Sequence, residues 1–569
     1  MHPIGSPIAG LKTRGLRSGI AAGLVLIMGL GLIVTTVIAL AGLGRLSNSV
    51  NWIHVPAWFW YYRADPAVQL WLTVGAGVSG SGITVIGLAI VLNHRRPLFG
   101  AAAWATPMEI RNAGLRARAG IVLGHTGSKP LVFGGSEHVL LHAPTRTGKG
   151  VGVVIPNLLS WPGSCVVLDV KQENWTASAG YRSECGHAVY LFDPLNAEGR
   201  TARYNPLGHI DRGDPELALD ELQKIAVMLF PAPLQSDPFW SEAARTGFIG
   251  VASLVAEISE LPFTIGEVFR QLTTEDPRQS LVDLVADRRS SGFPVTAGCA
   301  SAINDFTSTA EKTFASVKQT ITSRLALWLN PRVDAATSAS DFDLRMLRSC
   351  PISIYLGVSP ADVSRVSALY SLLTQQIIDL NSRALPDPER EPLQVLMMLD
   401  EFARLGRAEG LAHAFAYVAG YGLRMLAVLQ SPAQLRAIYG PDLAEEIVAN
   451  CAVEVAFAPK EIKVAQELSD RLGAYSYSGR SRSRPAGLSK GHRSITISDQ
   501  KRPLMLAQEL IALPADVLLV LKSGVPPILA RKLRFFEHTE FSRRCRPSPA
   551  VSPPKSAGQT ETEPESSSV

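Results

Sequence analysis

Two uncharged apolar runs near the N-terminus constrain this chain more than any other feature of its sequence. The first extends over Gly19–Gly44 and the second over Val68–Leu92. Each is longer than the roughly 20 residues that a helix needs to cross the hydrocarbon core of a bilayer. Both are rich in glycine, and small residues let membrane helices approach each other closely. The two runs therefore predict transmembrane helices at about residues 19–44 and 68–92.

The residues around these runs predict their orientation. Aromatic side chains crowd the linker between them, as at a membrane interface. Basic residues gather outside the pair, with Lys12, Arg14 and Arg17 before the first run and Arg95 and Arg96 after the second. This bias predicts that both ends are cytoplasmic and that the linker is a short periplasmic loop, so that residues 1–96 form an anchor. The alternative is a cleaved signal peptide followed by one anchor, but the first run is longer than a typical signal core.

Composition narrows what the rest of the chain can be. A length of 569 residues corresponds to about three to four domains. The six cysteines are scattered and form no C-x-x-C pair, which argues against a zinc site or a disulfide framework. Free thiols suit a reducing, cytoplasmic body. The net charge of +5 permits contact with nucleic acid or anionic lipid and specifies neither.

The segment HVLLHAPTRTGKGVGVVIPNLL, His138–Leu159, has the order strand, glycine-containing loop, helix, and the apolar strand Cys165–Lys171 follows it. This is the context of a phosphate-binding loop, although Ala143 and Gly150 replace the usual glycine and hydroxyl residue. Backbone N–H groups and a lysine, here Lys149, would hold the phosphates. The predicted nucleotide-binding residues are Thr145, Arg146, Thr147, Gly148, Lys149, Gly150 and Val151. Taken alone, this loop leaves a chance glycine loop as an equal alternative.

A second motif supports the nucleotide site. Pro392–Gly406 is an apolar strand that ends in the adjacent acids Asp400 and Glu401, as in a Walker B motif. Asp400 would hold Mg²⁺ and Glu401 would orient and polarise the attacking water. The alternative is a pair of surface acids that open a helix. The next strand, Leu423–Ser431, carries Gln430 at its C-terminal end, where it could sense the γ-phosphate. The alternative is that Gln430 is merely a polar residue at the end of a strand.

Beyond these two motifs, the chain resembles the coupling proteins of type IV secretion systems, the TraG/TraD-like group of conjugation ATPases. The resemblance runs from about residue 97 to residue 545. It rests on motifs in the following order: GAAAWAT (Gly100–Thr106), APTRTGKGVGVVIPNLL, VLDVKQEN (Val167–Asn174), YNPL (Tyr204–Leu207), DPFWSEAART (Asp237–Thr246), LDEFARLG, AGYGLRMLAVLQSPAQLRAIYG (Ala419–Gly440), NCAVEVAF (Asn450–Phe457) and RPLMLAQEL (Arg502–Leu510). In TraG-like members the loop commonly reads G-K-G, so Gly150 looks like a trait of the family.

The resemblance implies an α/β fold, namely a RecA-like P-loop motor domain with an inserted all-α domain, preceded by the two transmembrane helices. The motor would comprise residues 97–214 and 331–545. Residues 215–330, where apolar residues recur at helical spacing, would form the insert, and Ile352–Val358 would resume the strands. Residues 546–569, rich in Pro and Ser, are expected to be a disordered tail.

The resemblance also implies ATP and Mg²⁺ as cofactors, ATP hydrolysis, and a homo-hexamer around a central channel in the bacterial inner membrane, with the bulk in the cytoplasm. Its partners would be a relaxase–DNA complex, single-stranded or double-stranded DNA, and components of the type IV secretion channel. The motor would deliver the relaxase and single-stranded DNA into that channel. The alternatives are a coupling protein for secreted proteins only, or a receptor that no longer hydrolyses ATP. A membrane metalloprotease is disfavoured because no H-E-x-x-H occurs.

The sequence leaves open which arginine completes the ATP site and what the basic stretch near residue 480 does. A neighbouring subunit of such a ring would supply an arginine to the ATP site. Arg424 is the nearest candidate and Arg407 is another, but Arg424 could equally be a salt-bridged residue at the start of a strand. The basic stretch Ser478–Ser494 could reach DNA phosphates as a flexible loop or could be a solvated insertion.

Overall fold

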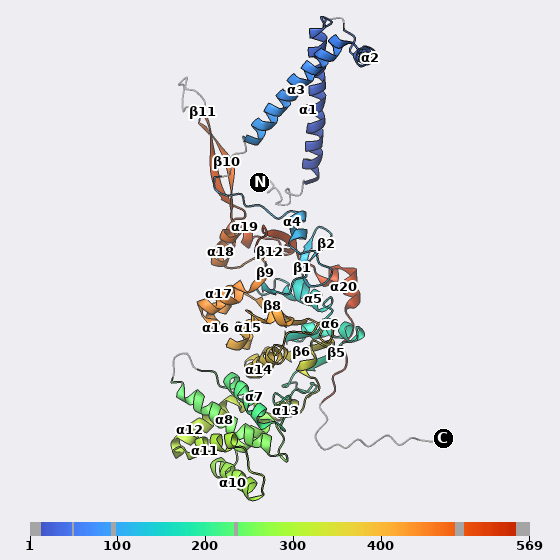
Figure 1. Cartoon of the computed structure of the whole chain (residues 1–569). Helices are drawn as coiled ribbons and strands as arrows, with labels where there is room; N and C mark the ends of the chain where they lie inside the picture. Colours follow the sequence, from blue (N-terminus) through green and yellow to red (C-terminus); the bar gives the residue numbers. More distant parts are fainter. Residues whose placement is uncertain (1–12, 48–49, 93–97, 233–236, 484–493, 554–569) are drawn as a thin grey trace, which may run out of the picture. The chain divides into compact units, whose positions relative to one another are not determined.

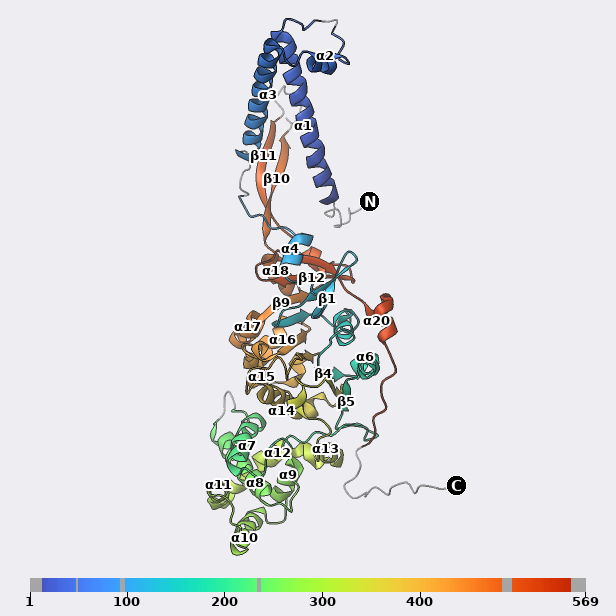
Figure 2. The same cartoon turned by 45° about the vertical axis from the view of Figure 1, so that its right-hand side comes forward.

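The structure is a computed structural model that describes residues 13–47, 50–92, 98–232, 237–483 and 494–553. The chain divides into two compact units, Met1–Leu98 and Phe99–Val569. Figures 1 and 2 show both units in two views.

The first unit consists of helices α1 (Thr13–Gly42), α2 (Val55–Tyr61) and α3 (Pro66–Leu92). Small residues let α1 and α3 pack closely: a Cβ atom at Gly75 would lie 2.7 Å from the backbone oxygen of Thr35, and the hydroxyls of Thr35 and Ser79 are 2.7 Å apart. In the described part of the chain, the stretch Pro66–Leu88 of α3 is long and apolar enough to cross a membrane, whereas Ile27–Gly42 of α1 is shorter. The second predicted span thus has a candidate helix, and the two-span anchor stays a prediction.

The second unit is built on an eleven-stranded sheet in the order β2-β1-β13-β12-β9-β3-β8-β7-β4-β6-β5. The strands from β9 to β5 in this order are parallel, and β12, β13, β1 and β2 extend the sheet in antiparallel pairing. Their bounds are β1 Ile121–Thr126, β2 Lys129–Phe133, β3 His138–His142, β4 Cys165–Val170, β5 Ala188–Phe192, β6 Ile352–Val358, β7 Val395–Leu399, β8 Leu423–Leu429, β9 Cys451–Ala456, β12 Val517–Lys522 and β13 Ile528–Arg531.

The parallel strands form because their sequences are almost uninterrupted aliphatic runs. Every residue of β6, β7 and β8 is buried, as expected for strands that are covered on both faces. The strands predicted at Cys165–Lys171, Ile352–Val358 and Leu423–Ser431 are confirmed as β4, β6 and β8. The helices of the sheet region are α4 Pro107–Asn112, α5 Ile155–Leu158, α6 Glu173–Glu184, α14 Val363–Asn381, α15 Glu409–Ala414, α16 Pro432–Tyr439, α17 Pro441–Ala449, α18 Ile462–Leu472, α19 Ala507–Ile511 and α20 Thr539–Arg544.

Between β5 and β6 the chain forms a group of helices, which Figure 1 shows gathered together in green. They are α7 Pro215–Leu229, α8 Phe239–Glu257, α9 Ile265–Leu272, α10 Pro277–Ser290, α11 Ala297–Ser308, α12 Glu311–Arg324 and α13 Pro331–Ala336. Side-chain caps begin several of them: Asp214, Thr264, Asp276 and Thr296 each accept a hydrogen bond from a backbone N–H group in the first turn. One hydrophobic cluster connects these helices with α14 and the sheet.

A long hairpin, β10 (Ala474–Ser483) and β11 (Ser494–Pro503), forms a separate two-stranded sheet. The basic stretch expected as a loop is therefore strand in its first part, while residues 484–493 lie outside the described residues. The beginning of the second unit is held at the base of this hairpin, because Phe99 N–H donates to the Ser476 hydroxyl at 2.8 Å and Ala102 N–H donates to the Ala474 carbonyl at 3.1 Å.

The first residues of the expected disordered tail lie against α6. The Ser548 hydroxyl donates to the carbonyl of Trp175 at 3.3 Å, and Val551 packs on a hydrophobic cluster of the sheet. A Cβ atom at Gly180 would lie 2.2 Å from the carbonyl oxygen of Pro547, so the glycine lets the two backbones approach. The expectation of disorder from residue 546 is therefore not met by residues 546–553, and residues 554–569 lie outside the described part.

Candidate active site

The two sequence motifs meet at the C-terminal ends of the parallel strands. The loop that follows β3 begins beside the end of β8, where Ala143 N–H donates to the Leu429 carbonyl at 2.8 Å. The acids Asp400 and Glu401 follow β7, which pairs with β8. Open parallel sheets bind ligands at this edge, because the loops that leave the strands converge there.

The loop between β3 and α5 has the tight backbone of a phosphate-binding loop. Arg146 and Gly148 have left-handed backbone angles, with φ of 62° and 80°. The Thr147 hydroxyl donates to the Pro144 carbonyl at 2.6 Å and closes the turn. Gly150–Val154 forms one π-helical turn that continues into α5. At Gly150 a Cβ atom would meet no other atom within 4 Å, so the position of the usual hydroxyl residue is open space.

Lys149 and the two acids form one charge cluster. The Lys149 amine lies 2.7 Å from Asp400 Oδ1 and 3.3 Å from Glu401 Oε1. Arg404 forms an ion pair with the other carboxylate oxygen of Glu401. Burial raises the pKa of Asp400 above its ordinary value, and the charge and hydrogen bond of Lys149 oppose this rise. Glu401 has a left-handed backbone, with φ of 60°, so a sharp turn after β7 presents its side chain to the loop.

A magnesium ion would fit this cluster only together with phosphate oxygens. Over the described residues, no group of three or more His, Cys, Asp or Glu side chains could hold a metal ion. Asp400 supplies one carboxylate next to the phosphate loop. This donor set suits Mg²⁺, which proteins commonly bind with one or two carboxylates, water and substrate phosphates.

Asp169, at the end of β4, is a further acid at this edge, to which the sequence reasoning assigned no role. Its carboxylate accepts hydrogen bonds from the backbone N–H groups of Asn174 at 3.2 Å and Trp175 at 2.7 Å. Burial is the main reason that the pKa of Asp169 rises to about 6, and the negative charge of Asp400 adds to the rise. The acid occurs in VLDVKQEN, whose strand-end position was the only available signal.

The structure brings Gln430 to the loop. Gln430 lines a cavity of about 440 Å³ together with Pro144 and Thr145 of the loop and Lys460 from the segment after β9. The backbone N–H of Gln430 donates to the side chain of Gln434 at 3.0 Å. The cavity therefore adjoins the phosphate loop.

The exposure of the two candidate arginines decides whether either could enter the ATP site of a neighbouring subunit. Arg424 lies near the N-terminal end of β8, whereas the loops of the site follow the C-terminal ends. Arg424 is 1% exposed, and its guanidinium donates to the carbonyls of Glu137 and Phe133. Arg407 forms an exposed pair with Glu409. An enclosed guanidinium cannot reach a neighbouring subunit, so the structure does not support Arg424 as a catalytic residue, whereas Arg407 stays an untested candidate.

Two lysines that no motif marked contact the loop from the C-terminal half of the chain. Lys460 donates to the carbonyl of Thr145 at 3.0 Å, and Lys532 donates to the carbonyl of Thr147 at 2.9 Å. Lys532 follows β13 and is separated from Thr147 by 385 residues of chain. No pattern of neighbouring residues could have identified either contact.

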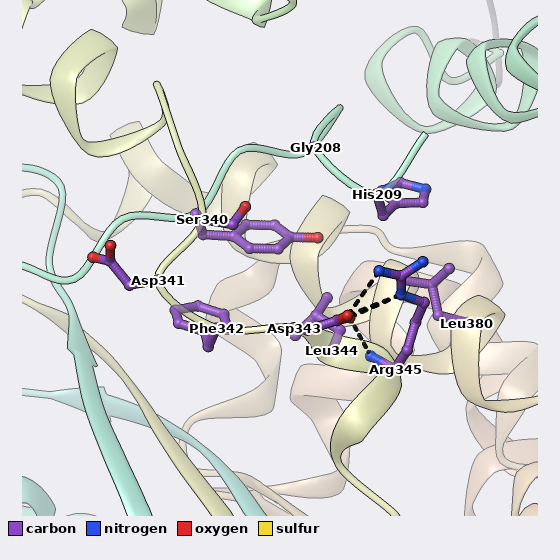
Figure 3. Close-up of a pocket in the computed structure, with 10 residues that line it drawn as sticks. Gly208, His209, Ser340, Asp341, Phe342, Asp343, Leu344, Arg345 and Leu380 are labelled. Atoms are coloured by element: carbon purple, nitrogen blue, oxygen red, sulfur yellow. Dashed lines mark hydrogen bonds and ion pairs between the residues drawn. The ribbon is translucent and has the colours of Figure 1, made fainter. Parts of the chain in front are cut away.

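A separate cavity of about 310 Å³ is lined by the segments just before and just after the helical group and by Leu380 of α14 (Figure 3). His209, Asp343 and Arg345 line it, and Asp343 pairs with Arg345 at 2.8 Å. Both acidic and basic side chains line this cavity, and none of the site residues predicted from the sequence is among them.

Comparison with known proteins identifies the family. Residues 103–559 match the family described as Type IV secretory system Conjugative DNA transfer. The chain is 32% identical to Protein VirD4 of Rhizobium rhizogenes over 502 residues, which cover 85% of this chain and 73% of that protein. It is 30% identical to the Conjugal transfer protein TraG of Escherichia coli over 582 residues, with 90% of each chain covered.

Solved structures show the same fold. The coupling protein TrwB in its unbound form aligns with a TM-score of 0.57 at 18% identity, covering 77% of this chain and 93% of that one. TrwB in complex with ADP and Mg²⁺ aligns with a TM-score of 0.56 at 18% identity, covering 77% and 96%. These likenesses agree with the parallel sheet and its helices in supporting an α/β, RecA-like motor fold. With the sequence relatives, they lead to one conclusion: this chain belongs to the coupling proteins of type IV secretion, the family of conjugative DNA transfer that includes TraG and VirD4.

Proposed function

We propose that this coupling protein is a membrane-anchored ATPase that receives a relaxase–single-stranded DNA substrate and uses ATP hydrolysis to drive it into the type IV secretion channel. The observation that carries the proposal is the cluster of Lys149, Asp400 and Glu401 beside the phosphate loop. The cluster contains one group for phosphate, one for a metal ion and one for water. The related TrwB has been captured with an ATP analogue and with ADP and Mg²⁺, which supports the choice of nucleotide.

The residues of the cluster divide the chemistry among them. When phosphate oxygens enter the loop, they replace the two carboxylates as the partners of Lys149, because a lysine amine in this position binds β/γ-phosphates. Glu401 is then free to accept a proton from an attacking water, and Arg404 holds its second oxygen in place. Gln430 lies at the same edge, where it can contact the γ-phosphate. Mg²⁺, held by Asp400, would neutralise charge on the phosphates during transfer.

The remaining parts of the proposal concern placement and assembly. Residues 1–96 anchor the chain in the inner membrane with two spans, and the motor faces the cytoplasm. Residues 97–214 and 331–545 form the motor and residues 215–330 the helical insert. Helices α7 to α12 fall within 215–330, whereas α13 lies just beyond that boundary. Six copies assemble as a ring, in which a neighbour completes each ATP site with an arginine other than Arg424.

The test separates nucleotide binding from hydrolysis. Lys149→Ala removes the phosphate contact, so we expect weak ATP binding, no hydrolysis and no conjugative transfer. Glu401→Gln keeps a similar shape but cannot take a proton, so we expect ATP to stay bound while turnover falls by about 10²–10⁴-fold. Nucleotide affinity, turnover and transfer frequency are measured for each variant in the full-length protein.

Two controls make this test sharp. Gly150→Ser restores the usual hydroxyl in open space, and we expect little change in turnover. Glu445→Gln removes an exposed acid of α17 and should leave all three measurements unchanged. Turnover and transfer at the wild-type level in Glu401→Gln would remove Glu401 from the mechanism. Transfer of secreted proteins without transfer of DNA would favour the protein-only coupling function.

A further inference from the structure

Lys532 is a buried cation at the back of the phosphate loop. Its side chain is 5% exposed, and its amine lies 3.7 Å from the centre of the Phe457 ring. The amine donates to the Thr147 carbonyl at 2.9 Å. Gly152 provides room for this approach, since a Cβ atom there would lie 3.3 Å from Lys532 Cβ. Three segments, namely the loop, the residue that follows β9 and the π-helical turn, therefore meet at this one side chain.

Lys532 is buried without a carboxylate to balance its charge, as are Arg182 and Arg424 among the described residues. Among the residues that the structure describes, no acid lies within ion-pair distance of the Lys532 amine, whereas the buried Arg348 pairs with Glu391 at 3.1 Å. Removing an ammonium group from water without a paired charge is costly. Burial, with a smaller effect of Arg534, lowers the pKa of Lys532 to about 8, and Asp516 opposes this. Lys532 therefore places a positive charge close to the predicted phosphate site, where this charge can attract an anion.

The contact also sets the direction of one peptide group. The peptide unit is planar and trans, so its carbonyl and N–H point in opposite directions. Because the Thr147 carbonyl points to Lys532, the N–H of Gly148 points away from Lys532. Lys460 binds the Thr145 carbonyl in the same manner and so directs the N–H of Arg146. Phosphate loops work through such N–H groups, and here two lysines orient alternate peptides of the loop.

We propose that Lys532 is a positioning residue for phosphate binding, which holds the Thr147–Gly148 peptide with its N–H toward the phosphates and adds a buried positive charge behind the loop. Its ligand class is the phosphate chain of a nucleoside di- or triphosphate. The inference rests on the proposed ATP site and goes beyond it, because it adds a C-terminal residue to that site. Lys460 is exposed and plays the smaller part, since water screens its charge and competes for its hydrogen bond.

The experiment measures the dissociation constants of MgADP and MgATP for full-length protein in detergent. Lys532→Met keeps the apolar stem and removes the charge and donor. A hydrogen bond to a charged group contributes roughly 1.5–3 kcal/mol, so we expect binding to weaken about 10- to 100-fold for both nucleotides. Lys532→Arg keeps charge and donors and should recover most of the affinity. Lys522→Met, at the opposite end of neighbouring β12, is the matched control and should bind as the wild type does.

A pH profile distinguishes positioning from general packing. As pH rises above about 8, wild-type Lys532 gives up its proton, so nucleotide affinity should fall. Lys532→Arg should show no such fall between about pH 8 and 9.5, because an arginine stays charged. In turnover the effect should appear mainly in KM, since the contact exists before the reaction begins.

The outcomes distinguish a failure of this inference from a failure of the proposed function. Wild-type affinity in a folded Lys532→Met variant would overturn the inference and leave the ATP site intact, provided that Lys149→Ala still weakens binding. If Lys532→Met does not fold, the comparison of the pH profiles of wild type and Lys532→Arg decides, and identical profiles would overturn the inference. If the wild-type protein binds neither nucleotide, the proposed function and the inference both fail.

Discussion

At the scale of single residues, burial separates arginines that the sequence could not distinguish. Arg424 is fully enclosed, and its guanidinium lies over the rings of Phe133 and Trp161. Burial lowers its pKa to about 10. Arg404 is half exposed and is paired with Glu401. The first arginine therefore supports the fold, whereas the second can influence the chemistry.

Opposite effects are expected when each arginine is changed to alanine. Arg424→Ala should lower the free energy of unfolding by about 2–4 kcal/mol, because it leaves a cavity and unpaired carbonyls in the core. Its ATP turnover per folded molecule should stay within about twofold of wild type. Arg404→Ala should change stability by less than about 1 kcal/mol and reduce turnover. Thermal unfolding and turnover are measured on both variants, and a loss of turnover without a loss of stability in Arg424→Ala would restore it as a candidate finger.

At the scale of elements, a buried carboxylate joins the strand before the phosphate loop to the C-terminal part of the sheet. Glu454 of β9 contacts His142, the last residue of β3, at 3.3 Å. Arg471 of α18 donates to the same carboxylate at 3.0 Å and through a second hydrogen bond. Burial by itself would raise the pKa of Glu454, but the hydrogen bonds from His142 and Arg471 outweigh it and lower the pKa to about 2. The position of the loop thus depends on a carboxylate, that of Glu454, which stays ionised.

This depressed pKa makes stability depend on pH in a defined window. A carboxyl group with a lowered folded pKa stabilises above its unfolded pKa, and the stabilisation disappears as pH falls through the folded pKa. Glu454 should therefore contribute about 3 kcal/mol at pH 7, and this should be lost between about pH 4.5 and pH 2. Glu454→Gln should be less stable than wild type at pH 7 and equal to it near pH 2. The measurement is the apparent free energy of unfolding against pH.

Glu184→Gln serves as the control for this prediction, because Glu184 forms an exposed pair with Arg546. Exposed pairs contribute little, so its profile should follow the wild type. A Glu454→Gln profile parallel to the wild type at every pH would show that the carboxylate does not stabilise the sheet.

At the scale of the whole molecule, the chain consists of an N-terminal helical unit and a large sheet unit. The hairpin of β10 and β11 holds the first residues of the second unit through hydrogen bonds between residues 99–102 and 474–476. The start of the sheet unit is therefore attached to the base of this hairpin.

The two-span anchor predicts a topology that fusions can check. A reporter that is active only outside the cytoplasm, fused after Asn48, should be active, because the linker carries few basic residues. The same reporter fused after Ala101 should be inactive. Activity at both sites, or at neither, would rule out two spans with both ends inside. A fusion after Thr13, before the first span, serves as the cytoplasmic control.

Local sequence patterns were sufficient for much of this protein. The phosphate loop, the strand that ends in Asp400 and Glu401, and the strands β4, β6 and β8 are each encoded in fewer than about a dozen neighbouring residues. Apolar runs, glycines and strand-end acids are local signals, because the backbone conformations that they favour are decided by adjacent residues. The family resemblance rests on the same short motifs, and the comparisons bear it out.

The tertiary structure alone decided which residues meet. The burial of Arg424, the hairpin in the basic stretch, the packing of residues 546–553 on α6, and the contact of Lys532 with Thr147 have no local signal. Lys532 reaches the loop because β13, β12, β9 and β3 are adjacent in the sheet, although their order in the chain is different. The order of the strands depends on which side chains from distant segments are buried together in one core. Patterns among neighbouring residues therefore cannot reveal this order.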